Sequence, residues 1–185
     1  PKPFSTGMIT INDLDKIINE ASKNSIPFGI FQCSSSYPTP SKLWGLDLIP
    51  MFRKKYNCPV GFSDHSGDIF AGIAAATLGA DFLEVHVTFD KNMFGPDTSS
   101  SITFGELNKL VKGTKSIRES LSNKTDKDSL VSETIHLRES FGRSLALIND
   151  LPSGSKITDQ DLTLKKPGTG IQYEEINKII GRYLK

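Results

Sequence analysis

Four short apolar segments recur along the first half of the chain, and each of them ends in polar residues. They cover residues 2–6, 27–33, 59–62 and 82–89. Amphipathic segments separate them, so the sequence predicts four consecutive β-then-α units of roughly 25 to 30 residues each. This alternation constrains the fold strongly, because parallel strands need crossover connections that are usually helices.

The amphipathic segments carry recognisable helix signals. Thr10 is a suitable N-cap for the first helix, and Thr103 with Glu106 three residues later forms a capping-box pattern for the last. The two middle helices are predicted over 43–56 and 69–78, and Gly79 is a good residue to end the second of them.

Four such units match half of an eight-unit (β/α) barrel, in which about 31 residues make up each unit. An open doubly wound α/β sheet is the alternative. All four predicted strands end in polar residues, and barrel enzymes collect polar side chains at the C-terminal ends of their strands. We therefore expect residues 1–121 to form the C-terminal half of a TIM barrel.

The composition changes after residue 121. Residues 122–137 are polar and charged without a sustained apolar period, which predicts a linker. Residues 138–185 form a second small unit with a predicted strand at 144–148 and a loop at 167–170. A unit of this size rarely folds on its own core, so we expect it to need support.

The bulk composition indicates an ordinary globular protein, with 37% hydrophobic and 23% charged residues. A net charge of +1 gives no general attraction to nucleic acid or to a membrane surface. No apolar run approaches the roughly 20 residues of a membrane span. Cys33 and Cys58 make no disulfide framework, so we expect reduced thiols in a cytoplasmic protein.

The fourth predicted strand gives the clearest indication of chemistry. Successive side chains of a strand point to opposite faces, so Glu84, His86 and Thr88 share one face. Ser63 and His65 share a face of the preceding strand in the same way. Since adjacent strands lie about 4.8 Å apart, His65 and His86 could converge on one metal ion. Two hydrogen-bonded structural histidines are the alternative, because this spacing is not a known metal motif.

Five stretches in order resemble the sialic acid synthase family, which includes legionaminic and pseudaminic acid synthases. They are residues 5–8 (STGM), 33–40 (CSSSYPTP), 61–66 (GFSDHS), 84–88 (EVHVT) with 95–97 (GPD), and 165–170 (KKPGTG). The resemblance implies an α/β chain with the C-terminal half of a TIM barrel, followed by a small antifreeze-like (SAF, β-clip) domain over 138–185.

The resemblance also implies a metal site. His65 and His86 match the two histidines that hold a divalent metal, most often Mn²⁺, with Mg²⁺ or Co²⁺ as alternatives. Two imidazoles with open positions suit such an ion, although zinc would bind them as readily. Together with Glu84, these histidines are the expected catalytic residues. Glu84 would steer water or the enol carbon, or else orient a histidine.

Further matching positions imply contacts with two substrates. Ser35, where several relatives have Asn, and Ser63 would line the phosphoenolpyruvate site, whereas Tyr37 and Asp97 would lie beside the amino sugar. Lys166 stands where the family commonly has Arg, which reaches the sugar bound by the partner subunit. The resemblance therefore implies a domain-swapped homodimer, and a lysine there keeps the charge without the bidentate fork.

The implied reaction condenses phosphoenolpyruvate with an N-acylated hexosamine. It gives a nine-carbon 2-keto sugar acid and phosphate, as part of glycan biosynthesis. A non-catalytic carbohydrate-binding remnant and another metal-dependent barrel aldolase are the alternatives. The family's phosphate-binding lysines would precede Pro1. We therefore expect a chain that is truncated at both ends and inactive by itself.

Overall fold

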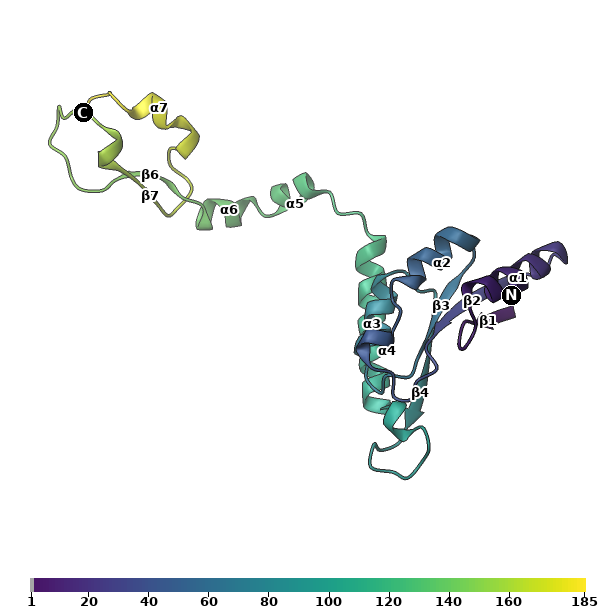
Figure 1. Cartoon of the computed structure of the whole chain (residues 1–185). Helices are drawn as coiled ribbons and strands as arrows, with labels where there is room; N and C mark the ends of the chain where they lie inside the picture. Colours follow the sequence, from purple (N-terminus) through teal and green to yellow (C-terminus); the bar gives the residue numbers. More distant parts are fainter. Residues whose placement is uncertain (1) are drawn as a thin grey trace. The chain divides into compact units, whose positions relative to one another are not determined.

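The computed structural model describes residues 2–185, which divide into two compact units, one ending at Lys124 and the other spanning Thr125–Lys185. The first unit is built on a five-stranded sheet in the order β1-β2-β3-β4-β5, with all neighbours parallel (Figure 1). Its strands are β1 (Lys2–Ser5), β2 (Phe28–Cys33), β3 (Val60–Asp64), β4 (Phe82–Thr88) and β5 (Ser101–Thr103).

Four helices of the first unit alternate with these strands. They are α1 (Ile11–Lys23), α2 (Leu48–Tyr56), α3 (Phe70–Thr77) and α4 (Phe104–Ser122). Each strand lies next to the one before it in the sequence, so the strand order never reverses. Because crossover connections are right-handed, connections that all advance along the sheet in the same direction put every helix on the same face. A doubly wound sheet would reverse its order at a switch point. The prediction of a half-barrel α/β architecture is therefore confirmed.

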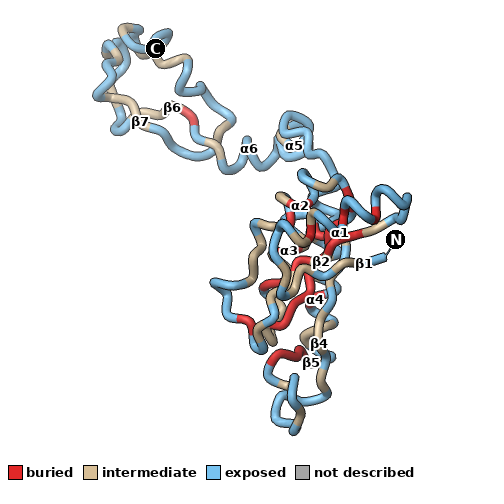
Figure 2. Tube along the Cα trace, turned by 45° about the vertical axis from the view of Figure 1, so that its right-hand side comes forward, coloured by how far each residue is buried: buried red, intermediate tan, exposed pale blue. Residues whose placement is uncertain are grey.

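The core of the first unit lies between the helices and one face of the sheet. Figure 2 shows the buried segments gathered there. Leu14 of α1, Phe52 of α2, and Ile30 and Val60 of the sheet are at most 1% exposed. Ile30 and Val60 are partners in the β2–β3 register and point to this helix-covered face. Residues of opposite parity, such as Ser63 and Glu84, belong to the other face.

Two local predictions differ from the structure. The helix predicted over 43–56 begins only at Leu48, because Gly45 has a positive φ of 64° and turns the chain after the 3₁₀ turn Ser41–Leu43. Strand β5 was not predicted. It has only three residues, too few to show an alternating pattern, and it exists because it pairs with the end of β4.

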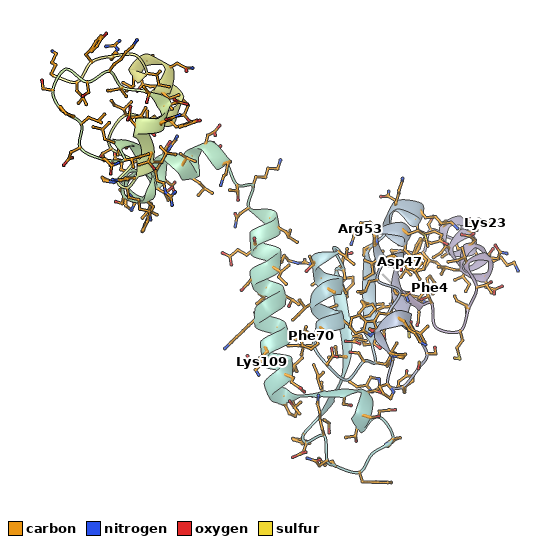
Figure 3. The ribbon with its side chains drawn as sticks, turned by 60° about the vertical axis from the view of Figure 1, so that its left-hand side comes forward. Phe4, Lys23, Asp47, Arg53, Phe70 and Lys109 are labelled. Atoms are coloured by element: carbon orange, nitrogen blue, oxygen red, sulfur yellow. The ribbon has the colours of Figure 1, made fainter. Side chains whose placement is uncertain are left out.

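Contacts between elements fix the helices around the sheet. Arg53, labelled in Figure 3, lies on α2. Its guanidinium donates to Asp81 Oδ2 at 2.6 Å, just before β4, and also to the Gly79 carbonyl. Gly79 has a φ of +91° after α3, as predicted for a helix-ending glycine. These bonds tie the end of α2 to the turn that leads from α3 into β4.

The capping box at the start of α4 is confirmed. Glu106 Oε2 accepts from the Thr103 backbone N–H at 2.7 Å, and Thr103 Oγ1 accepts from the Glu106 N–H at 3.3 Å. Lys91 Nζ donates to Glu106 Oε1 at 2.9 Å. These bonds, from Lys91 first and then from Thr103, lower the pKa of Glu106 from 4.5 to about 2.

A Glu106→Gln substitution is expected to destabilise the first unit by about 1–2 kcal/mol at pH 7, after allowance for the solvent screening of this partly exposed pair. A carboxyl group whose pKa is lower in the folded state stabilises the fold at pH values above its unfolded-state pKa. The difference from wild type should therefore shrink as pH falls from about 4.5 toward 2. Urea unfolding at pH 7 and pH 3 measures the difference in the free energy of unfolding between the variant and wild type, with Glu119→Gln on the same helix as the control. An unchanged difference at low pH would contradict the prediction.

The second unit contains three helices, α5 (Lys127–Glu133), α6 (Ile135–Phe141) and α7 (Ile176–Ile179), and an antiparallel pair, β6 (Ser144–Leu147) with β7 (Leu162–Lys165). Helix α5 and the start of α6 fall within the segment 122–137, which was predicted as a linker. Ser144 Oγ donates to the Pro167 carbonyl and accepts from the Gly170 N–H, both at 2.8 Å. These bonds fix the loop that follows β7. No helix among residues 2–185 combines the length and the apolarity needed to cross a bilayer.

Candidate active site

The structure brings His65 and His86 together at the C-terminal ends of β3 and β4. Ser63 and Glu84 are partners in the parallel register, so the histidines two residues further along share one face. Their ring centroids lie 5.0 Å apart. His65 is buried with 4% of its surface exposed, and the His86 side chain is 30% exposed. One histidine is thus held within the fold, and the other borders solvent.

Tyr37 completes a cluster of three rings. It lies in the loop after β2, and its Oη atom is 2.9 Å from His65 Nε2, a hydrogen-bond distance. The Tyr37 ring centroid lies 4.2 Å from that of His65 and 5.8 Å from that of His86. Burial lowers the pKa of His65, and His86 acts in the same direction, which favours the neutral imidazole. Partial burial, followed by the charges nearby, raises the pKa of Tyr37.

Two carboxylates flank the rings, and each has a different partner. Ser63 Oγ donates to Glu84 Oε1 at 3.0 Å, on the face opposite the helices. Asp97 Oδ2 lies 3.7 Å from His86 Nδ1, which is too long for a hydrogen bond. Asp97 is thus the carboxylate beside a histidine, whereas Glu84 is held by a serine.

The remaining predicted residues lie elsewhere. Ser35 is exposed and faces the loop after β1, where a Cβ atom added to Gly7 would lie 2.8 Å from Ser35 Oγ. No hydrogen bond joins Ser35 to the ring cluster among the described residues. Lys166 belongs to the second unit, where its Nζ lies 5.0 Å from the centre of the Phe141 ring, a cation–π contact.

Two buried polar residues that support the site were missed at the sequence level. The Thr39 backbone N–H donates to the His65 carbonyl at 2.9 Å, which ties the Tyr37 loop to the end of β3. Gln32 accepts from Thr6 Oγ1 at 3.1 Å and donates to the Trp44 carbonyl at 3.3 Å. For Gln32 the sequence did offer a signal, because a polar residue stands there at a helix-facing position of an otherwise apolar strand. For Thr39 the only signal was its place between two prolines.

The two histidines suit a shared divalent ion. With metal–nitrogen bonds of about 2.1 Å, two imidazoles on one ion have ring centres up to about 6–7 Å apart, and the observed 5.0 Å lies within that reach. No group of three or more His, Cys, Asp or Glu side chains within residues 2–185 is placed to hold a metal ion. The remaining coordination positions would belong to water or substrate oxygens, as in catalytic metal sites.

Comparison with known proteins identifies both parts of the chain. The NeuB family model matches residues 3–126, and the SAF domain model matches residues 142–185. The chain is 31% identical to an N,N'-diacetyllegionaminic acid synthase of Legionella pneumophila, over 100% of this chain and 52% of that protein. It is 30% identical to the human N-acetylneuraminate-9-phosphate synthase, over 98% of this chain and 51% of that protein.

A solved structure agrees with these relatives. The N-acetylneuraminic acid (sialic acid) synthetase of Leptospira borgpetersenii, crystallised with citrate, matches with a TM-score of 0.65 and 32% identity. The match covers 74% of this chain and 48% of that one. The chain therefore spans about half the length of the relatives it matches. The NeuB model covers about two thirds of the chain, and this part includes the ring cluster. The chain therefore belongs to the NeuB family, and it carries an SAF domain at residues 142–185.

Proposed function

We propose that this chain carries the metal- and sugar-binding half of a synthase that condenses phosphoenolpyruvate with an N-acylated hexosamine. The products would be a nine-carbon 2-keto sugar acid and phosphate, used in cytoplasmic glycan biosynthesis. The convergence of His65, His86 and Tyr37 at the strand ends of a NeuB-family half-barrel carries this proposal. The names of the relatives support it, because they are synthases of legionaminic and neuraminic acids.

In this proposal His65 and His86 hold the divalent cation, with Mn²⁺ as the first candidate and Mg²⁺ or Co²⁺ as alternatives. When bound, the ion supplies Lewis-acid polarisation of the sugar aldehyde. His65 suits this role because it is buried and its lowered pKa favours the neutral imidazole that a metal ion binds. His86 borders solvent, where a substrate can approach.

We assign Glu84 to the reacting centre rather than to the support of a histidine. Its carboxylate is oriented by Ser63, and the carboxylate nearest a histidine is that of Asp97. Glu84 is exposed on the face of the sheet opposite the helices, where it can orient water toward C2 of phosphoenolpyruvate. Ser63 then acts through Glu84. Tyr37 and Asp97 would contact the sugar, Ser35 would border the phosphoenolpyruvate site, and Lys166 would approach the sugar from an SAF domain.

The test is an assay of the full-length protein with phosphoenolpyruvate, a panel of N-acylated hexosamines and Mn²⁺. We expect phosphate and a 2-keto acid to form in equal amounts, and both to stop when a chelator is added. Glu84→Gln should lower turnover about 100-fold, because an oriented acid–base group typically contributes 10²–10⁴. Glu119→Gln, on the exposed side of α4, serves as the control.

The alternatives give different results. Hexosamine binding without any product would indicate a carbohydrate-binding remnant. Condensation when pyruvate replaces phosphoenolpyruvate, with no phosphate released, would indicate a metal-dependent aldolase. Either outcome would overturn the proposed reaction.

A further inference from the structure

One nitrogen of His65 already has a partner, and it is the nitrogen that faces the cluster. Nδ1 is buried and has no hydrogen-bond partner among the described residues. Nε2 lies 2.9 Å from Tyr37 Oη, and the Tyr37 ring lies within 5.8 Å of both imidazole rings. Because Nδ1 is buried within the fold, we infer that a metal ion shared with His86 reaches His65 through Nε2, on the side where the phenol lies.

Hydrogen bonds of neighbouring residues anchor the Tyr37 loop, whereas half of the Tyr37 surface is exposed. The Thr39 N–H donates to the His65 carbonyl at 2.9 Å, and Trp44 Nε1 donates to the Thr39 carbonyl at 3.3 Å. The loop is thus attached to β3 and to the segment before α2. Tyr37 itself is 50% exposed, and its hydroxyl contacts His65. Rotation of this side chain can release Nε2 without a shift of the loop backbone.

We propose that the Tyr37 phenol and a divalent cation compete for Nε2 of His65. Tyr37 is then a positioning residue that holds the imidazole in its orientation and limits the affinity for the metal. This inference rests on the proposed metal site. It differs from a role of Tyr37 in sugar binding, because it predicts an effect on metal affinity when no substrate is present.

The direction of the effect follows from linkage. A cation that must first displace a hydrogen bond binds more weakly. Its dissociation constant rises by a factor about equal to the equilibrium constant for forming that hydrogen bond. For a bond of ordinary net strength this factor is about five. Removing the phenol hydroxyl should therefore tighten metal binding about fivefold. A tyrosine that ligated the ion or merely supported the fold would give the opposite change when it is removed.

The experiment measures Mn²⁺ binding to the full-length protein by the EPR signal of the free ion, without substrates. Tyr37→Phe should lower the dissociation constant about fivefold. Tyr183→Phe removes the hydroxyl of an exposed tyrosine in the second unit and should change nothing. In the metal-free protein, ¹⁵N NMR of the histidine rings should show a shifted His65 Nε2 in Tyr37→Phe only. Circular dichroism confirms the fold, and Tyr37→Leu replaces Tyr37→Phe if that variant does not fold.

Each result has one meaning. Tighter binding with the His65 shift supports competition. Unchanged or weaker binding of Mn²⁺ to Tyr37→Phe, with wild type binding normally, overturns the inference and leaves the metal site intact. If neither protein binds Mn²⁺, the metal site of the proposed function fails, and the inference fails with it.

Discussion

His65→Ala or His86→Ala is expected to weaken Mn²⁺ binding by the full-length protein at least 100-fold and to abolish most metal-dependent turnover. The two imidazoles are the proposed side-chain ligands, and the structure places their ring centroids 5.0 Å apart. No third ligand joins them into a larger group within residues 2–185, so one histidine alone would leave the ion mostly hydrated. Isothermal titration calorimetry with Mn²⁺ measures the change directly.

The shared ion also predicts that the effects are not additive. Once one histidine is lost, removal of the second has little binding left to remove, as is found for residues that act as a unit. His136→Ala is the matched control, because His136 is an exposed histidine on α6 of the second unit. A double variant much weaker than either single variant would show that the histidines act independently and would contradict the shared-ion proposal.

Lys166→Ala and His86→Ala are each expected to be nearly inactive, and mixing the two full-length variants is expected to restore activity. The reason for this expectation lies in the small core of the second unit. Among residues 125–185 the only buried one is Ser144, while Phe141 is 66% and Tyr183 is 67% exposed. A unit with so little core needs a surface to dock on. We propose that it docks on the partner subunit of a homodimer, so that Lys166 serves the site of the other chain.

The dimer proposal sets the size of the recovery. Random exchange makes half of the dimers heterodimers, and each of these joins one intact His86 site to one intact Lys166, so about a quarter of wild-type activity should return. Lys165→Ala, at the neighbouring position of β7, is the control for Lys166. Sizing and mass spectrometry of isotope-labelled subunits verify the exchange. If exchange is complete and no activity returns, the SAF domain acts on its own barrel or does not reach the site.

Much of the first unit could be predicted from the sequence, because the signals are local. Apolar runs with helical or alternating periods report which face of an element is buried, and Thr103 with Glu106 reports where α4 begins. The same alternation put His86 and Glu84 on one face of β4, since side-chain direction in a strand depends only on parity. Strand β5 lacked such a signal, because three residues show no period.

The partners of the site residues were decided by tertiary structure. Tyr37 reaches His65 across 28 positions of sequence through a loop whose path depends on hydrogen bonds from Thr39 and Trp44. Glu84 pairs with Ser63 because parallel register places them side by side, and His86 lies near Asp97 because the loop after β4 folds back. Periodicity determines which way a side chain points, whereas its partner depends on chain segments that meet only when the sheet and its loops are assembled.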